Sequence, residues 1–299
     1  MAEVATAPSS HAHTSESGVE IPAAPSAWRR LGLGFWLSTA WLAVVVAFAL
    51  LAPVFNDDPT ATRLAGPFEG PSSELWFGAD ATGRDVFALT IWGARTSLLV
   101  GFIAIFVGFF FGGALGIAAG YFRGLFDKIV SFVFSVLLSF PALLLAIFVT
   151  DLLGRTLFWV SISLGVLAIA PVGRLARAQT MVFAEKEFVT AARILGAGDA
   201  RILWREIIPN VVIPMSALAL LGMGIAIVAE GTLAFLGVSV DGGLSWGRQI
   251  FASGSTREFL QSGPHAALFP IAAVTLTVLA LNYAGDRLRE IFDAKELSL

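Results

Sequence analysis

The sequence contains no cysteine and only three histidines, and charged residues make up 14% of its 299 positions. Without cysteine the chain can form no disulfide bond, iron–sulfur cluster or thiolate zinc site. The histidines, His11, His13 and His265, are too few and too scattered to indicate a metal centre. A soluble domain is about one quarter charged, so this shortage of charge indicates that much of the surface faces lipid. The net charge of −3 argues against nucleic acid as a partner.

Signatures of nucleotide binding and of common hydrolases are also missing. No lysine follows the phosphate-loop pattern Gly-x-x-x-x-Gly-Lys-Ser/Thr, in which backbone amides and the lysine hold nucleotide phosphates. The patterns His-Glu-x-x-His and Gly-x-Ser-x-Gly are absent as well. We therefore expect a chain that is not an enzyme, and any ATP that it uses must bind to another chain.

Long apolar runs, by contrast, are plentiful. A helix needs about 20 apolar residues to cross roughly 30 Å of hydrocarbon. Six runs have this size: Leu31–Phe55, Thr96–Phe122, Ile129–Thr150, Thr156–Gly173, Ile207–Ala229 and Ala266–Gly285. They are continuous rather than alternating, which argues against a transmembrane β-barrel. The sequence therefore predicts an all-α integral membrane protein with six transmembrane helices. The fifth run continues past Glu230 into Gly231–Val240, so this helix is expected to be long, tilted or broken.

The distribution of basic residues predicts the orientation in the membrane. With the N-terminus inside, 13 of the 19 lysine and arginine residues lie inside and six outside, as the positive-inside rule favours. Both termini are then cytoplasmic. Residues 1–30 are expected to form a disordered cytoplasmic tail without a cleavable signal peptide. Residues 31–290 form one helical bundle that ends in a short cytoplasmic helix, and residues 291–299 form a short cytoplasmic tail.

The second run carries Gly108, Gly112, Gly116 and Gly120, spaced four residues apart on nearly one helix face. Small residues at this spacing let another helix backbone approach closely in lipid. Two interpretations stay open: packing against another helix of the same chain, or a contact with a second subunit.

An inside segment, residues 185–209, carries the most information. Glu187–Leu195 is amphipathic and prone to form a helix, which Gly196 and Gly198 should end. Asp199 is the expected N-cap of a second short helix, Ala200–Glu206, and Pro209 marks the entry to the fifth span. Six apolar side chains in this segment need a groove on this chain, a partner or the membrane surface: Phe188, Ile194, Leu195, Ile202, Leu203 and Trp204.

Ala191, Ala192, Gly196 and Pro209 match the EAA motif of bacterial ABC importer permeases. The segment resembles most closely the peptide and nickel permease family, in the branch of the DppC and OppC subunits, with Glu187 as the acidic residue of that branch. Three further segments resemble the same branch: Phe77–Asp85, Gly93–Ser97, and Glu230–Gly237 followed by Ser245-Trp246-Gly247. Departures from the pattern are Thr190, Glu206 and Ile208.

The resemblance implies a type I ABC importer transmembrane domain in a bacterial inner or plasma membrane. Residues 185–209 would be the coupling segment that docks into a cleft of an ATP-hydrolysing subunit, which binds ATP and Mg²⁺. The coupling residues implied are Glu187, Ala191, Ala192, Gly196, Asp199 and Pro209. A second, B-type permease and an extracytoplasmic substrate-binding protein are implied as further partners. Short peptides, meaning dipeptides or oligopeptides, are the substrate that the resemblance favours, and nickel or another small solute remains possible. Transport would proceed by alternating access.

A few polar residues outside the coupling segment invite a functional interpretation. Glu230 is an acid within apolar sequence, so it either lines the translocation path or makes a structural hydrogen bond at a helix break beside Gly231. Asp80, Arg84 and Asp85 either form a platform for the binding protein or belong to a surface helix capped by Thr82. Trp246 and Arg248 are candidates for the same platform, although tryptophan is also common at the membrane boundary.

Two other functions compete with the importer. A secondary transporter would need intramembrane acids or matched broken helices, and only Glu230 qualifies. A membrane adaptor would recruit a soluble partner through the same segment without transport, so uptake by the reconstituted protein separates the two.

Overall fold

The computed structural model describes residues 32–55, 59, 65–253 and 263–296. The predicted tail 1–30 and residues 297–299 lie outside the described residues. Within these residues, eleven helices and two π-helical segments follow one another: α2 (Gly32–Phe55), α3 (Val86–Val107), η1 (Gly108–Gly113), α4 (Ala114–Phe122), α5 (Gly124–Ser139), α6 (Ala142–Leu153), α7 (Leu157–Ala184), α8 (Glu187–Ile194), α9 (Asp199–Ile202), η2 (Leu203–Ile207), α10 (Ile208–Phe235), α11 (Trp246–Ala252) and α13 (His265–Glu296).

The apolar helices bear out the predicted fold class. Five helices in the described part are long and apolar enough to cross a membrane, and α5 with α6 forms a sixth, bent span. The prediction of a continuous third helix is wrong, because α5 and α6 meet at 92°. Pro141 explains the break: it has no N–H group, and it forces Phe140 before it out of the helical region (ψ 138°).

Four helices extend well beyond the apolar runs that predicted them. The second span is one helical stretch, Val86–Phe122, and includes Arg95, whose guanidinium lies 5.4 Å from the centre of the Trp92 ring. The fourth extends to Ala184 through Arg174 and Arg177. The fifth is unbroken at Gly231 and ends at Phe235. The sixth continues to Glu296, so the short helix predicted to follow this span is part of it.

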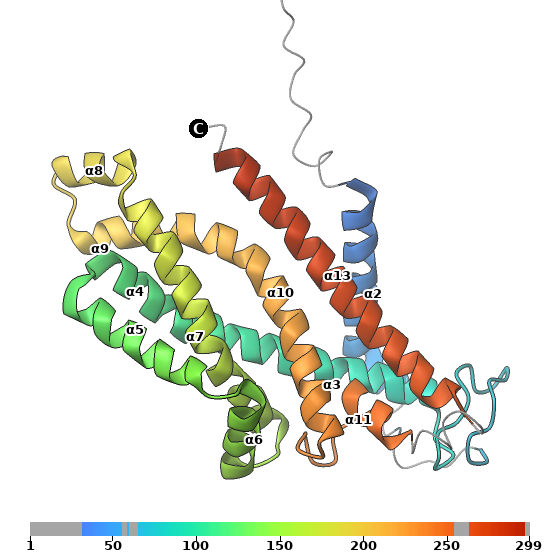
Figure 1. The fold of residues 1–299 in the computed structure, drawn as a ribbon. Helices are drawn as coiled ribbons and strands as arrows, with labels where there is room; N and C mark the ends of the chain where they lie inside the picture. Colours follow the sequence, from blue (N-terminus) through green and yellow to red (C-terminus); the bar gives the residue numbers. More distant parts are fainter. Residues whose placement is uncertain (1–31, 56–58, 60–64, 254–262, 297–299) are drawn as a thin grey trace, which may run out of the picture.

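The helices pack in two groups that share the long α3–η1–α4 helix. In one group α7 lies along η1 and α4, with α5 beside α7. In the other, α13 packs on both α2 and α10, and all three helices pack on α3. Figure 1 shows α8 and α9 at one end of the molecule, together with the start of α2 and the end of α13. We call this the elbow end, and the opposite end, which carries α11, the α11 end.

The four glycines of the second span face α7. A Cβ atom at Gly112 would overlap the carbonyl oxygen of Ile169, and one at Gly116 would overlap that of Gly173. Gly108 and Gly120 meet Ala168 and Arg177 in the same way. The helix backbones therefore touch. Of the two interpretations of the glycine face, the structure supports packing against another helix of the same chain.

Replacing Gly116 by alanine should lower the stability of the chain by about 1–3 kcal/mol, because the added methyl group forces two backbones apart. Thermal unfolding of the purified chain in mild detergent measures the change. Gly113→Ala is the matched control: it lies on the same helix, and a Cβ there meets nothing within 4 Å. This control should keep or raise the melting temperature, since alanine favours helix. An equal fall in both variants would contradict the packing account.

Candidate functional site

The segment between α7 and α10 forms a sharp turn between two helices, which we call the elbow (α8, residues 195–198, α9 and η2). Gly196 adopts φ +83°, a conformation that glycine reaches without strain. Its N–H donates to Arg193 O, and the N–H of Ala197 donates to Ala192 O, both at 3.0 Å. This pair of bonds is a Schellman motif, which satisfies the last carbonyls of α8. The predicted glycine turn is therefore present at Gly196.

The second half of the elbow differs from the prediction in two respects. Gly198, not Asp199, occupies the N-cap position of α9, and the Asp199 carboxylate accepts a hydrogen bond from the Tyr121 hydroxyl at 2.7 Å. Furthermore, α9 continues through η2 into α10 as one helical stretch, Asp199–Phe235. Pro209 lies in the first turn of α10 and does not separate the elbow from the fifth span; the π-helical turn before it accommodates the missing N–H group.

One side of the elbow is buried. Val189, Ile202 and Ile207 are at most 1% exposed and pack against Ile117 of α4, Phe183 of α7 and Met215 of α10. An ion pair between Arg123 and Glu185 (2.7 Å) further ties the end of α4 to the end of α7. The elbow is thus held on the ends of three long helices.

The other side of the elbow is exposed and apolar. Ile194 is 81% exposed, Leu195 86% and Trp204 72%, and Phe188 is also exposed. Of the six apolar side chains that needed a groove, only Ile202 is buried within this chain, and Leu203 is half-buried. Glu187 and Ala191 lie exposed beside them, and Ala192 is half-buried. In the described part of the chain nothing covers this surface.

Glu230 lies near the other end of α10 and is completely buried. Its Oε1 atom accepts a hydrogen bond from the Ser239 hydroxyl at 2.6 Å, and the hydroxyls of Ser97 and Ser245 lie close to the carboxyl group. The structure therefore favours the structural hydrogen bond, although not at a helix break. Because the Glu230 side chain is fully buried, it lines no open surface that could belong to a translocation path.

Residues 236–253, which we call the outer segment, fold back from α10 and carry α11. Trp246 is 1% exposed, and its Nε1 donates to Thr90 O at 2.9 Å, while its backbone N–H donates to Ser97 Oγ at 3.2 Å. The Gln249 amide donates to Leu89 O. The prediction of an exposed Trp246 is wrong, because this side chain binds the outer segment to α3. Arg248 is exposed and donates to Val240 O at 2.6 Å.

The segment before α3 is organised by two carboxylates. Asp80 pairs with Arg84 at 2.8 Å and accepts further bonds from Thr82. Burial raises the pKa of Asp80, but the hydrogen bonds from Arg84 and Thr82 outweigh it and bring the pKa below its ordinary value. Asp85, not Thr82, is the N-cap of α3, since it accepts from the Phe87 N–H at 2.8 Å. Burial raises the pKa of Asp85.

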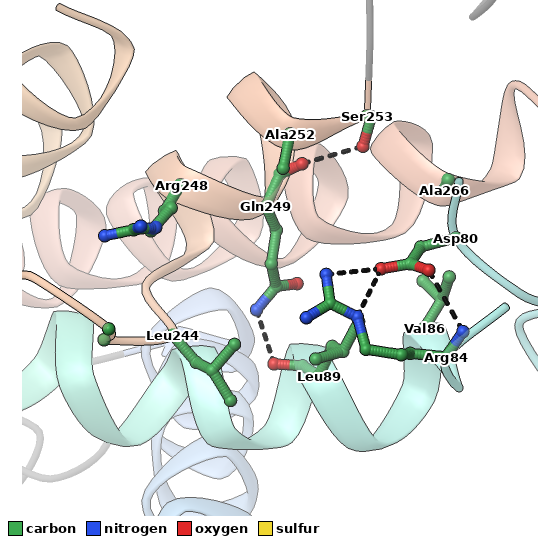
Figure 2. A pocket seen from close by; sticks show the side chains of 12 residues that line it. Asp80, Arg84, Val86, Leu89, Leu244, Arg248, Gln249, Ala252, Ser253 and Ala266 are labelled. Atoms are coloured by element: carbon green, nitrogen blue, oxygen red, sulfur yellow. Dashed lines mark hydrogen bonds and ion pairs between the residues drawn. The ribbon is translucent and has the colours of Figure 1, made fainter. Parts of the chain in front are cut away.

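These two regions enclose a cavity of about 400 Å³ at the α11 end. Figure 2 shows Arg84 turned toward Asp80, Gln249 reaching down to Leu89, and Arg248 pointing to the side. Asp80, Arg84 and Arg248 therefore gather around one cavity, as a common platform requires, whereas Asp85 caps the helix below it.

Sequence reasoning missed the residues that hold the outer segment. Thr90 and Gln249 lie outside the recognised segments, and Ser97 was noted only as the end of Gly93–Ser97, with no role assigned to it. Their partners lie 149 to 160 positions away in the chain, so no local pattern could have identified them.

Comparison with known proteins decides the family. The family model described as "binding-protein-dependent transport system inner membrane component" matches residues 112–297. The chain belongs to this family. It is a multi-pass membrane permease subunit of an ABC importer, and its relatives in this family are permeases rather than ATPases.

Individual relatives agree with the family model. The chain is 36% identical to the dipeptide transport system permease protein DppC of Alkalihalophilus pseudofirmus over 264 residues, which cover 87% of this chain and 86% of that protein. It is 40% identical to the glutathione transport system permease protein GsiD of Shigella flexneri over 76% of this chain and 74% of that protein. The match to the solved structure of the MetNI methionine ABC transporter covers 69% of this chain and 97% of the chain in that structure, with a TM-score of 0.55 and 17% sequence identity. The predicted fold and family are confirmed.

In this permease, Glu230→Ala should cost about 1–3 kcal/mol of stability, because it leaves the buried Ser239 hydroxyl without its acceptor. Glu230→Gln should cost less, since an amide oxygen of similar size can still accept. Thermal unfolding in detergent measures both variants, with Glu74→Ala, an exposed acid of the same kind, as the control. If the glutamine variant lost as much stability as the alanine variant, the hydrogen bond would not be the reason.

Proposed function

We propose that this permease subunit conducts short peptides across a bacterial inner or plasma membrane. It would act with a second, B-type permease, with ATPase subunits that bind ATP and Mg²⁺, and with an extracytoplasmic substrate-binding protein. The relatives named for dipeptide and glutathione transport support a peptide substrate, because both names denote short peptides. Their names leave the individual peptide open.

The observation that carries this proposal is the exposed apolar surface of the elbow. A surface formed by Ile194, Leu195 and Trp204 is costly to leave in water, and its rigid base suits a part that transmits force. We assign it as the docking site for the ATPase, with Glu187, Ala191, Ala192 and Gly196 shaping it. Asp199 and Pro209 support it from the side of α10.

The path of coupling follows from the helix that begins in the elbow. The stretch Asp199–Phe235 contains 37 residues, about 55 Å at 1.5 Å per residue. A displacement of the elbow by the ATPase would therefore reach the outer segment through a single helix. Glu230, hydrogen-bonded to Ser239, would pass this movement to the outer segment. We propose this role for Glu230 in place of the lining of the translocation path that the sequence suggested.

The arrangement of the ends supports the proposed orientation. The start of α2 and the end of α13 lie at the elbow end (Figure 1). Since ATP is cytoplasmic, docking at the elbow puts both termini in the cytoplasm. The cavity at the α11 end then faces outward, where Asp80, Arg84 and Arg248 would contact the binding protein. Trp246 supports this platform from beneath.

The double substitution Ile194→Ser/Leu195→Ser tests the docking surface. Both side chains are exposed, so the melting temperature should not change, whereas ATP-driven peptide uptake in proteoliposomes should fall at least about tenfold as apolar contact area with the ATPase is lost. Co-purification of the ATPase from the membrane should fall in parallel. Leu33→Ser, at an exposed leucine of α2 outside the elbow, is the matched control.

The same assay separates the competing functions. Uptake that persists without ATP, driven by an ion gradient, would indicate a secondary transporter. Recovery of a bound soluble protein without any uptake would indicate an adaptor. Normal ATP-driven uptake by the double variant would sink the proposed docking surface.

A further inference from the structure

Helix α5 has two exposed faces of opposite character. Ile129, Val133, Val136 and Phe140 form an apolar strip in which each side chain is 42–54% exposed. Asp127, Ser131, Ser135 and Ser139 form a second strip at four-residue spacing, and Ser135 and Ser139 are exposed. Lys128 lies exposed beside this polar strip. The apolar strip suits lipid. The serine hydroxyls of the polar strip donate to Asp127 or to backbone carbonyls, but their oxygens can still accept hydrogen bonds, and Lys128 adds an exposed charge, so the polar strip suits water better than lipid.

Arg174 of α7 reaches this polar strip. Its Nη2 atom donates to Ser135 Oγ at 2.9 Å, and Ser135 in turn donates to Ser131 O at 2.8 Å. Arg174 is exposed and lies 17 residues from the start of α7 at Leu157, about 26 Å along the helix. It thus lies in the elbow-end half of a spanning helix.

The nearby acids are already engaged. Both oxygens of the Asp127 carboxylate bond Arg177, and Oδ1 also accepts from Ser131. Glu185 pairs with Arg123. None of the ion pairs in the described part of the chain includes Arg174. Its guanidinium, with up to five donors, is therefore left with a single hydroxyl partner.

We infer that the polar strip of α5 lines the elbow-end part of a water-filled translocation path, and that Arg174 binds the carboxylate of the passing solute there. This inference rests on the proposed peptide import. A short peptide carries a terminal carboxylate, which a guanidinium holds through two parallel hydrogen bonds. Lys128 adds positive charge on the same strip, so anionic groups are favoured. Ser135 orients Arg174 along the strip.

The first test concerns water and does not depend on the substrate. The chain has no cysteine of its own, so a thiol reagent can label this chain only at a single cysteine that has been introduced. In the assembled importer, a charged, membrane-impermeant thiol reagent should label Ser139→Cys but leave Val136→Cys, on the apolar strip of the same helix, unlabelled. Equal labelling of both variants, or labelling of Val136→Cys alone, would overturn the path.

The second test concerns the carboxylate. In proteoliposomes with the full importer, Arg174→Gln should lower the uptake of alanyl-alanine about tenfold, with Arg174→Lys intermediate. Uptake of alanyl-alanine amide, which lacks the carboxylate, should be equally low in the wild type and in Arg174→Gln. Arg287→Gln, the same charge change at a half-buried residue of α13 that pairs with Glu290, should not alter the uptake of either peptide. An equal effect of Arg174→Gln on both peptides would overturn carboxylate binding.

Lipid phosphate is the other source of an anionic oxygen. If the effect of Arg174→Gln disappears in liposomes that contain only phosphatidylcholine and returns with phosphatidylglycerol, Arg174 binds an anionic lipid, and the inference is wrong. If the wild type transports neither peptide while Ser139→Cys is labelled, the peptide assignment fails, carboxylate binding fails with it, and the water-filled path stands.

Discussion

The backbone contact between the α3–η1–α4 helix and α7 is the constraint on which the rest of the molecule depends. Gly112 and Gly116 allow it, because a side chain at either position would occupy the space of a carbonyl oxygen of α7. On its other side, α7 receives the Phe134 ring of α5 against Gly173. In lipid no hydrophobic driving force joins helices, so such close packing must supply much of the association. The position of α7 in turn sets where the elbow begins.

A second constraint links the two ends of the permease. The elbow and the fifth span share one helix, and Glu230 near its far end holds the outer segment through Ser239. Trp246 then joins the outer segment to α3. In the proposed coupling, every link is a packed or hydrogen-bonded contact, so movement at the elbow would displace the outer segment with it. A difference in the affinity of the ATPase for two positions of the elbow would then drive the change.

Hydropathy predicted the spans because a membrane helix must satisfy its own backbone and present apolar side chains. It could not predict their ends, since Arg95 and Arg174 end an apolar run without ending a helix. Nor could proline be interpreted from the sequence alone. Pro171 and Pro214 lie inside continuous helices, whereas Pro141 divides α5 from α6. The difference depends on whether neighbouring helices hold the chain straight, which is tertiary information.

The first half of the elbow was predictable because its cause is local: a glycine, Gly196, at the position that needs positive φ. The two polar residues with the greatest functional interest were not. Glu230 attracts attention in the sequence because a carboxyl group is costly among apolar residues. The same cost explains why serine hydroxyls surround it in the structure, and only the fold brings these serines close to it. Arg174 looks like an ordinary topology signal, and only the structure shows that its acidic neighbours are taken. In a membrane protein, an exposed guanidinium with spare donors on a polar helix face is therefore a stronger indication of ligand binding than a buried carboxyl group whose hydrogen bonds lie within the chain.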